Sequence, residues 1–173
     1  FPYTTLFRSK AMRTAPRAEA FRALLAEFEA AFPDPLLPTW VFGNHDRPRM
    51  SARLGQDPSL ARLLATLQLT ARGVPFIYYG EEIGLPHSDL PLRDALDPVA
   101  HGYRFLPQAV ARALRRRGLL LNRDECRAPM PWSGEPGAGF TAPGVRPWLP
   151  LHPASATQNV AAQARDEASV LAC

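Results

Sequence analysis

Two short apolar runs, each preceded by an amphipathic helical pattern, constrain the fold of this chain most strongly. Residues 39–43 (Thr-Trp-Val-Phe-Gly) and residues 74–79 (Val-Pro-Phe-Ile-Tyr-Tyr) are apolar almost throughout and do not alternate with polar residues. Such runs are typical of strands buried on both faces of a parallel sheet. The order helix, strand, helix, strand therefore predicts an α/β fold with the two strands parallel and adjacent, joined by a right-handed helical crossover.

The two helical patterns have marked ends. The first begins near Ala18 and stops before Pro33, and its apolar positions follow the spacing of one helix face: Phe21, Leu24, Leu25 and Phe28. In the second, Asp57 is a suitable N-cap, Pro58 suits the first helical position, and Gly73 is predicted to end the helix. The predicted buried stripe of this helix consists of Leu60, Leu63, Leu64 and Leu67.

The C-terminal half is predicted to be rich in loops. The chain has 19 prolines, and they concentrate in residues 32–38 and 129–153, where they exclude helix and strand interiors. Residues 81–153 break the helix–strand order, apart from a short basic helix predicted around residues 107–117. Residues 158–172 then resume a helical pattern.

The first residues do not fit this pattern. Residues 1–10 match neither helical nor strand periodicity, and we interpret them as a non-native N-terminal scar, which leaves residues 11–173 for the domain. No apolar run approaches the length of a membrane span, and the N-terminus lacks the order of a signal peptide. We therefore expect no membrane partner and a cytoplasmic location.

The charged residues and cysteines exclude several other classes. The densest basic run, residues 112–117, has no interleaved aromatic residues, so a solvated helix face is a better interpretation than a nucleic-acid patch. Cys126 and Cys173 show neither a disulfide framework nor metal-ligand spacing, which favours two free thiols and no metal site. We expect no cofactor, and the sequence leaves the oligomeric state open.

Polar residues that suit a sugar site follow the first strand-like run. In α/β barrels the functional residues lie at the C-terminal ends of the strands. Asn44, His45 and Asp46 occupy this place, and an ionised aspartate accepts the hydrogen bonds that sugar hydroxyls donate. The same triplet is also common turn chemistry, and taken alone it favours a plain loop.

Two further charged groups have open interpretations. Glu81 and Glu82 follow the second run, but neighbours in sequence rarely point at one substrate atom, so a structural role for Glu81 is preferred. Arg123 and Arg127 flank Asp-Glu-Cys and can bind hydroxyls or a carboxylate in a bidentate manner. The alternative for these arginines is a surface ion pair.

Four motifs in order resemble the α-amylase family of glycoside hydrolases. Residues 41–49 (Val-Phe-Gly-Asn-His-Asp-Arg-Pro-Arg) resemble its segment with the third catalytic aspartate, and residues 73–84 are similar to its eighth barrel strand. Residues 123–132 (Arg-Asp-Glu-Cys-Arg-Ala-Pro-Met-Pro-Trp), with Gly-Phe-Thr and Pro-Trp-Leu-Pro further on, are similar to a loop of its α-glucosidase and oligo-1,6-glucosidase members. Asn159, Val160 and Gln163 resemble the start of its last barrel helix.

The resemblance implies a fold and a set of site residues. The fold is an incomplete TIM (β/α)8 barrel: the last two strands with their helices and a loop-rich insertion, because a full barrel takes about 250 residues. Asp46 matches the aspartate that stabilises the oxocarbenium-like transition state, and His45, with Asn44 beside it, matches the histidine that binds hydroxyls of the same sugar. Arg127 matches the arginine that recognises the terminal glucose, with Arg123 as the second choice.

The resemblance also implies a retaining α-glucosidase that acts on terminal α-glucosidic bonds of oligosaccharides or other α-glucosides. This chemistry needs a carboxylate nucleophile and a carboxylic general acid. The family pattern places both on strands that precede this chain, so the chain alone is expected to be inactive. The alternatives are a glucosyl-transferring or isomerising member, such as a trehalose synthase, and a non-catalytic barrel relative, against which the presence of His45 and Asp46 speaks.

Overall fold

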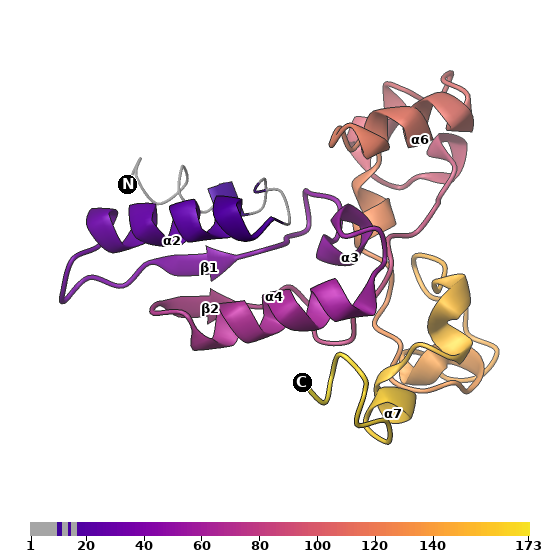
Figure 1. Ribbon diagram of the computed structural model, residues 1–173. Helices are drawn as coiled ribbons and strands as arrows, with labels where there is room; N and C mark the ends of the chain where they lie inside the picture. The colour runs from indigo at the N-terminus through magenta and orange to yellow at the C-terminus, as the bar shows by residue number, and fades with distance from the viewer. Residues whose placement is uncertain (1–9, 12–13, 15–16) are drawn as a thin grey trace.

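The computed structural model describes residues 10–11, 14 and 17–173 (Figure 1). Apart from Lys10, the proposed N-terminal scar lies outside these described residues. The first half of the chain contains α2 (Ala18–Ala31), β1 (Thr39–Val41), α3 (Met50–Arg53), α4 (Pro58–Thr70) and β2 (Val74–Phe76). The second half consists of loops and short helical segments: η1 (Leu92–Asp94), α5 (Pro98–His101), α6 (Gln108–Arg116), η2 (Arg123–Cys126), η3 (Pro136–Gly139), η4 (Pro153–Ala156) and α7 (Val160–Gln163).

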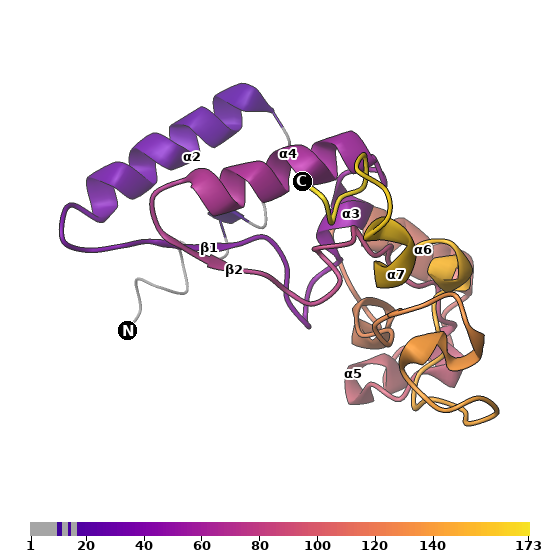
Figure 2. The same ribbon diagram turned by 90° about the horizontal axis from the view of Figure 1, so that it is seen from below.

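β1 and β2 form a two-stranded parallel sheet, which confirms the predicted pairing. The register runs from Thr39 opposite Val74 to Val41 opposite Phe76. Both α2 and α4 lie on the same face of this sheet (Figure 2). The two strands point toward α3 and the loop-rich second half, so their C-terminal ends meet the segments that carry the polar motifs (Figure 1).

The first strand is buried as predicted, but the second is not. Trp40 of β1 is 1% exposed, whereas Val74 and Phe76 of β2 are 41% and 54% exposed. Within the described residues, β2 has β1 as its single partner strand, and the helices cover one face of the sheet. The apolar run predicted two covered faces, and the second face is open in this chain.

The core lies between α2, α4 and β1. Phe28 packs against Trp40 with ring centroids 4.6 Å apart, and Phe21 meets Phe42 edge-on at 6.0 Å. Leu64 of α4 joins the same cluster. Burial of these large apolar side chains supplies most of the driving force for packing the two helices on the sheet.

The α4 helix begins as predicted, and three of the four predicted stripe residues pack in or against the core: Leu64 is buried, and Leu60 and Leu67 are partly buried. The Asp57 carboxylate accepts hydrogen bonds from the backbone N–H groups two and three residues later, at 2.8 and 3.4 Å, which confirms the N-cap. Leu63 of the predicted stripe is 62% exposed. The residues that α4 buries are spaced three and four apart along one face: Ala61, Leu64 and Gln68.

Gly73 does not end this helix, which stops at Thr70. The glycine has φ +143°, and a Cβ atom there would lie 2.6 Å from the Pro38 carbonyl oxygen and 2.8 Å from the Trp40 indole nitrogen. Glycine is therefore needed at this position because the chain passes close to β1.

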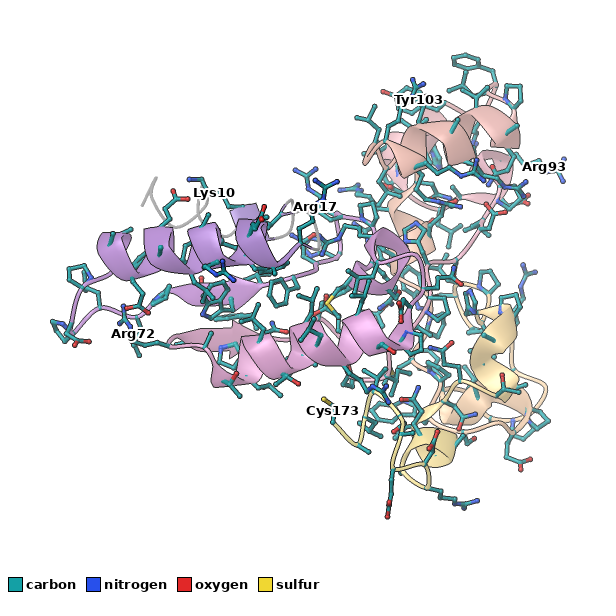
Figure 3. The ribbon with its side chains drawn as sticks, in the orientation of Figure 1. Lys10, Arg17, Arg72, Arg93, Tyr103 and Cys173 are labelled. Carbon is teal, nitrogen blue, oxygen red and sulfur yellow. The ribbon has the colours of Figure 1, made fainter. Side chains whose placement is uncertain are left out.

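Residues 88–121 form a small unit, which we call the α5–α6 module. The predicted basic helix is confirmed as α6. Figure 3 shows Arg93 and Tyr103 of the module on the opposite side of the molecule from Arg72. Arg72 donates hydrogen bonds to backbone carbonyls of the turn after α2. The module has its own apolar cluster of Leu92, Ala95, Ala100 and Ala111, with Leu106 and Leu121 packed against it.

The predicted helix over residues 158–172 is much shorter in the structure. It begins at Val160, after the cap residue Asn159, and ends at Gln163. Beyond it, the Ser169 hydroxyl donates to the Gln163 carbonyl and the Asp166 carboxylate accepts from a backbone N–H two residues later. Such local side-chain bonds compete with helical hydrogen bonds. None of the helices in the described part of the chain is long and apolar enough to cross a membrane.

Candidate active site

Asp46 lies in a tight turn directly after the end of β1. The Asn44 side-chain oxygen accepts a hydrogen bond from the Asp46 backbone N–H at 2.9 Å, which closes the turn. Asn44 therefore has a local structural task as well as its position at the site. The Asp46 side chain is 45% exposed and that of His45 is 65% exposed, so both are accessible to a ligand.

The Asp46 carboxylate is held by three basic side chains. Its Oδ2 lies 3.2 Å from the His45 Nε2. Its Oδ1 lies 3.2 Å from the Arg123 Nη1 and 3.2 Å from the Arg127 Nη2. The residues predicted from separate motifs are thus brought together around one carboxylate.

The segment that carries the two arginines docks on the Asn-His-Asp turn. The His45 carbonyl accepts hydrogen bonds from the Arg127 Nε at 3.0 Å and from the Cys126 thiol at 3.3 Å. The Tyr78 hydroxyl, just beyond β2, donates to the Cys126 carbonyl at 3.2 Å. Burial raises the pKa of the Cys126 thiol to about 11, so it stays a neutral donor, and both cysteines are free as predicted.

Arg123 makes a much stronger contact than the surface ion pair that was its alternative interpretation. Its Nε and Nη2 face the Asp97 carboxylate, at 2.9 and 2.6 Å. The Asp97 side chain is completely buried. Burial alone would raise the pKa of Asp97, but the hydrogen bonds from Arg123 and from the Val99 backbone lower it to about 2. Because a buried carboxylate is costly without partners, this pair is a fixed part of the site.

A second buried network supports the same segment from behind. The Glu125 carboxylate lies 2.8 Å from the Arg115 Nη1 and 3.3 Å from the His87 Nε2. The Glu125 carbonyl accepts from the Ser88 backbone N–H at 2.8 Å. Burial lowers the pKa of His87, which therefore stays neutral near pH 7. Sequence analysis does not predict the roles of His87 and Asp97, because their partners are 38 and 26 residues away.

Glu81 has the structural position that was preferred for it. It is 6% exposed, and one carboxylate oxygen accepts from the Tyr78 backbone N–H at 3.0 Å. The other oxygen packs so closely against Gly43 that a Cβ atom there would clash. Burial raises the pKa of Glu81 to about 7, and the Tyr78 hydrogen bond and the Arg53 charge offset this only in part.

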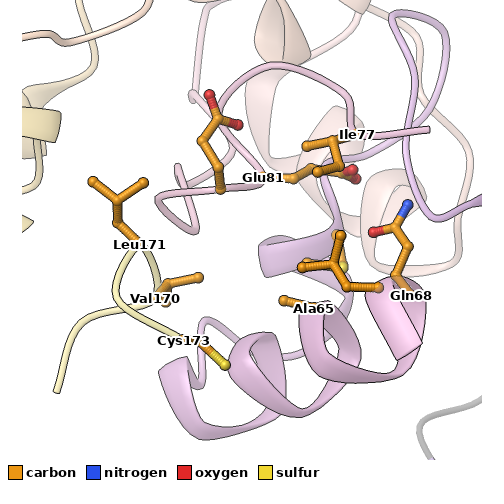
Figure 4. Close-up of a pocket in the computed structure, with 10 residues that line it drawn as sticks. Ala65, Gln68, Ile77, Glu81, Val170, Leu171 and Cys173 are labelled. Atoms are coloured by element: carbon orange, nitrogen blue, oxygen red, sulfur yellow. The ribbon is translucent and has the colours of Figure 1, made fainter. Parts of the chain in front are cut away.

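One pocket of the described residues lies outside this site. A pocket of about 90 Å³ between α4, the residues after β2 and the C-terminal residues is lined by Gln68, Ile77, Glu81, Val170 and Cys173, among others (Figure 4). Asn44, His45, Asp46 and the two arginines are not part of its lining. Across the described residues, no group of three His, Cys, Asp or Glu side chains lies close enough to hold a metal ion.

Comparisons with known proteins identify the family. The model of the family described as "Alpha amylase, catalytic domain" matches residues 3–173. An α-glucosidase of Apis mellifera is 30% identical over 98% of this chain and 27% of its own length, and an oligo-1,6-glucosidase of Parageobacillus thermoglucosidasius is 36% identical over 73% and 24%. The trehalulose synthase MutB from Pseudomonas mesoacidophila MX-45 superposes with a TM-score of 0.72 and 31% identity, over 91% of this chain and 29% of that structure.

The chain spans about a quarter of the length of these curated relatives. Family and structural similarity together imply that the catalytic domain is a TIM barrel. The matched region includes the turn with Asp46 and the segment with Arg123 and Arg127. The chain belongs to the α-amylase catalytic-domain family, on the side of its α-glucosidase and oligo-1,6-glucosidase members.

Proposed function

We propose that this chain is the C-terminal part of the catalytic barrel of a retaining α-glucosidase that hydrolyses terminal α-glucosidic bonds in oligosaccharides. The observation that carries the proposal is the half-exposed Asp46 carboxylate at the C-terminal end of a parallel strand, gripped by His45, Arg123 and Arg127. This is the end of the strands where barrel enzymes carry their chemistry.

The barrel part of the proposal rests on the sheet. Two parallel strands carry both helices on one face and leave the other open, which is the arrangement of one sector of a barrel wall. On this interpretation β1 and β2 are its last two strands, and the loop-rich segment after β2 is an insertion.

Asp46 acts on the sugar ring through its charge. Its oxygens accept hydrogen bonds from ring hydroxyls, and the negative charge gains most when positive charge develops at the anomeric carbon. His45 and Asn44 bind hydroxyls of the same sugar. Arg127, and secondarily Arg123, orient the terminal glucose. The nucleophile and the general acid come from the rest of the barrel, so this chain alone is inactive.

The test is Asp46→Asn in the complete polypeptide that carries this chain. The change keeps the shape and removes the charge, so kcat on an aryl α-glucoside should fall about a hundredfold or more, a loss of about 3 kcal/mol, while KM changes little. Steady-state kinetics with circular dichroism as a folding check measures this.

His45→Ala serves as the comparison. A side chain that only hydrogen-bonds sugar hydroxyls acts more evenly on bound substrate and transition state, so kcat should fall less than in Asp46→Asn. A folded Asp46→Asn enzyme that keeps its kcat within about tenfold of the parent would make Asp46 an ordinary turn residue and end the proposal.

A glucosyl-transferring or isomerising enzyme is the second candidate. The similarity to a trehalulose synthase at a TM-score of 0.72 favours it. Product analysis with maltose, isomaltose and sucrose separates the two candidates. Free glucose as the main product supports the hydrolase, and a rearranged disaccharide supports the isomerising enzyme. Release of neither, with a folded protein, indicates a non-catalytic barrel relative.

A further inference from the structure

Asp97 is a buried carboxylate that belongs to the α5–α6 module and faces the candidate active site through Arg123. Its Oδ2 accepts the Arg123 backbone N–H at 2.8 Å, and its Oδ1 accepts the Val99 backbone N–H at 3.1 Å. The backbone of Asp97 is held in turn by the Asp124 carboxylate, 2.9 Å from the Asp97 N–H. Backbone contacts therefore fix the position of this carboxylate from several directions.

The guanidinium of Arg123 divides its donors between two carboxylates. Nε and Nη2 form a fork on Asp97, with the shortest distance at 2.6 Å. Nη1 remains for the Asp46 Oδ1 at 3.2 Å. Because the guanidinium is planar, a fork on one side fixes the direction in which the third nitrogen points. The orientation of Arg123 toward Asp46 is thus set by Asp97.

We propose that Asp97 is a positioning residue for the reaction: it holds Arg123 in the orientation that keeps the Asp46 carboxylate in place for the sugar ring. This inference rests on the proposed function of Asp46. Arg127 contacts the same oxygen of Asp46 but has its Nε on the His45 carbonyl, so the two arginines reach Asp46 from separately anchored positions.

Without the fork on Asp97, Arg123 loses its fixed orientation toward Asp46. The Arg123 side chain is 29% exposed, so without the Asp97 charge it can turn toward water. Of its three basic contacts, the Asp46 carboxylate would then keep His45 and Arg127. Misplacement of a reacting or stabilising group by about 1 Å is enough to lower turnover strongly.

The test is a double-mutant cycle of Asp97→Asn and Arg123→Ala in the complete polypeptide. Asp97→Asn should lower kcat on an aryl α-glucoside about tenfold or more, with KM within about threefold of the parent. If Asp97 acts through Arg123, adding Asp97→Asn to Arg123→Ala should change kcat by less than about twofold. Fully additive effects, or parental kcat in Asp97→Asn, would overturn the inference.

Two controls keep the result interpretable. Asp94→Asn removes an exposed partner of Arg93 in the same module and should leave kcat within about twofold of the parent. If Asp97→Asn does not fold, Arg123→Lys takes its place: it keeps the positive charge but loses the fork, and the same drop in kcat is expected. Parental kcat in folded Arg123→Lys overturns the inference.

Failure of this inference and failure of the proposed function give different results. Asp46→Asn is measured on the same substrate in the same assay. If Asp46→Asn abolishes turnover and Asp97→Asn leaves it unchanged, only the positioning role is lost. If Asp46→Asn has no effect, the proposed function fails, whatever Asp97→Asn does.

Discussion

A buried carboxyl group makes the stability of this chain depend on pH. Glu81 links the two strand ends, since it accepts from the Tyr78 backbone N–H and packs against Gly43. Burial raises its pKa to about 7, above the ordinary value of 4.5 that applies in the unfolded chain. The folded chain therefore binds more protons than the unfolded chain between these two values, and its stability falls as pH rises through this window.

Glu81→Gln should remove this dependence, because the amide resembles the neutral acid in shape and carries no charge. From about pH 5 to about pH 8, the free energy of unfolding of Glu81→Gln should rise relative to the parent by roughly 2–3 kcal/mol. Urea unfolding followed by tryptophan fluorescence at each pH measures the difference. Glu19→Gln, on the exposed surface of α2, is the control and should track the parent. A constant difference between Glu81→Gln and the parent would show that folding does not raise the pKa of Glu81.

The sequence predicted the members of the candidate site better than their surroundings. Asp46, His45, Arg123 and Arg127 are predictable as candidates because their motifs follow strand ends or carry charged residues in a recognisable order. Asp97 is not, since a lone Asp-Pro pair indicates only a helix cap. Its partner Arg123 is 26 residues away, and a contact at that distance in sequence depends on how the whole module folds.

A polar residue of α4 ties this helix to both strands. Gln68 is 3% exposed, and its side-chain amide donates to the Trp40 carbonyl of β1 at 3.0 Å and to the Phe76 carbonyl of β2 at 2.9 Å. One amide thus satisfies carbonyl groups of two neighbouring strands. Apolar periodicity does not predict a buried glutamine in the middle of an apolar stripe, because it identifies buried positions by their apolar character.

Gln68→Leu should destabilise the chain although it is a change to a more apolar residue. Two buried or half-buried carbonyl groups lose their donor, which costs about 2 kcal/mol in the free energy of unfolding. Leu63→Ala on the same helix is the matched control, and because Leu63 is 62% exposed it should change stability by no more than about 0.5 kcal/mol. Urea unfolding of the two variants and the parent measures these free energies. Equal stability of Gln68→Leu and the parent would mean that water replaces the amide as the donor to both carbonyl groups.

The elements were predictable where local signals are strong. The start of α4 follows from Asp57 and Pro58, whose capping chemistry is local. The length of α7 was overestimated because Ser169 and Asp166 bond to nearby backbone groups instead of allowing the helix to continue. Helix ends depend on such competing bonds, and apolar periodicity does not report them.

At the scale of the whole molecule, the main departure from the predicted fold is the open face and edge of β2. Its apolar residues and those just after it are 37% to 54% exposed: Val74, Phe76, Ile77 and Tyr79. The sequence predicted a buried strand because these residue types are those of a strand covered on both faces. The apolar residues of β2 are therefore typical of a larger, covered sheet, whereas the described residues form a sheet of two strands.

An exposed apolar strand with an unpaired edge is a template for association with another chain. We therefore predict that this chain, purified alone, self-associates as its concentration rises from about 5 to about 100 μM, a range in which exposed strand edges associate.

Ile77→Lys places a charge on this surface and should shift the chain toward the monomer, because burying an unpaired charge in an interface is costly. Phe105→Lys is the matched control: Phe105 is 79% exposed but lies in the α5–α6 module, so its change should leave association as in the parent. Sedimentation velocity of the three proteins measures the result. If Phe105→Lys, and not Ile77→Lys, restores the monomer, the associating surface lies on the module and β2 is not the edge that seeks a partner.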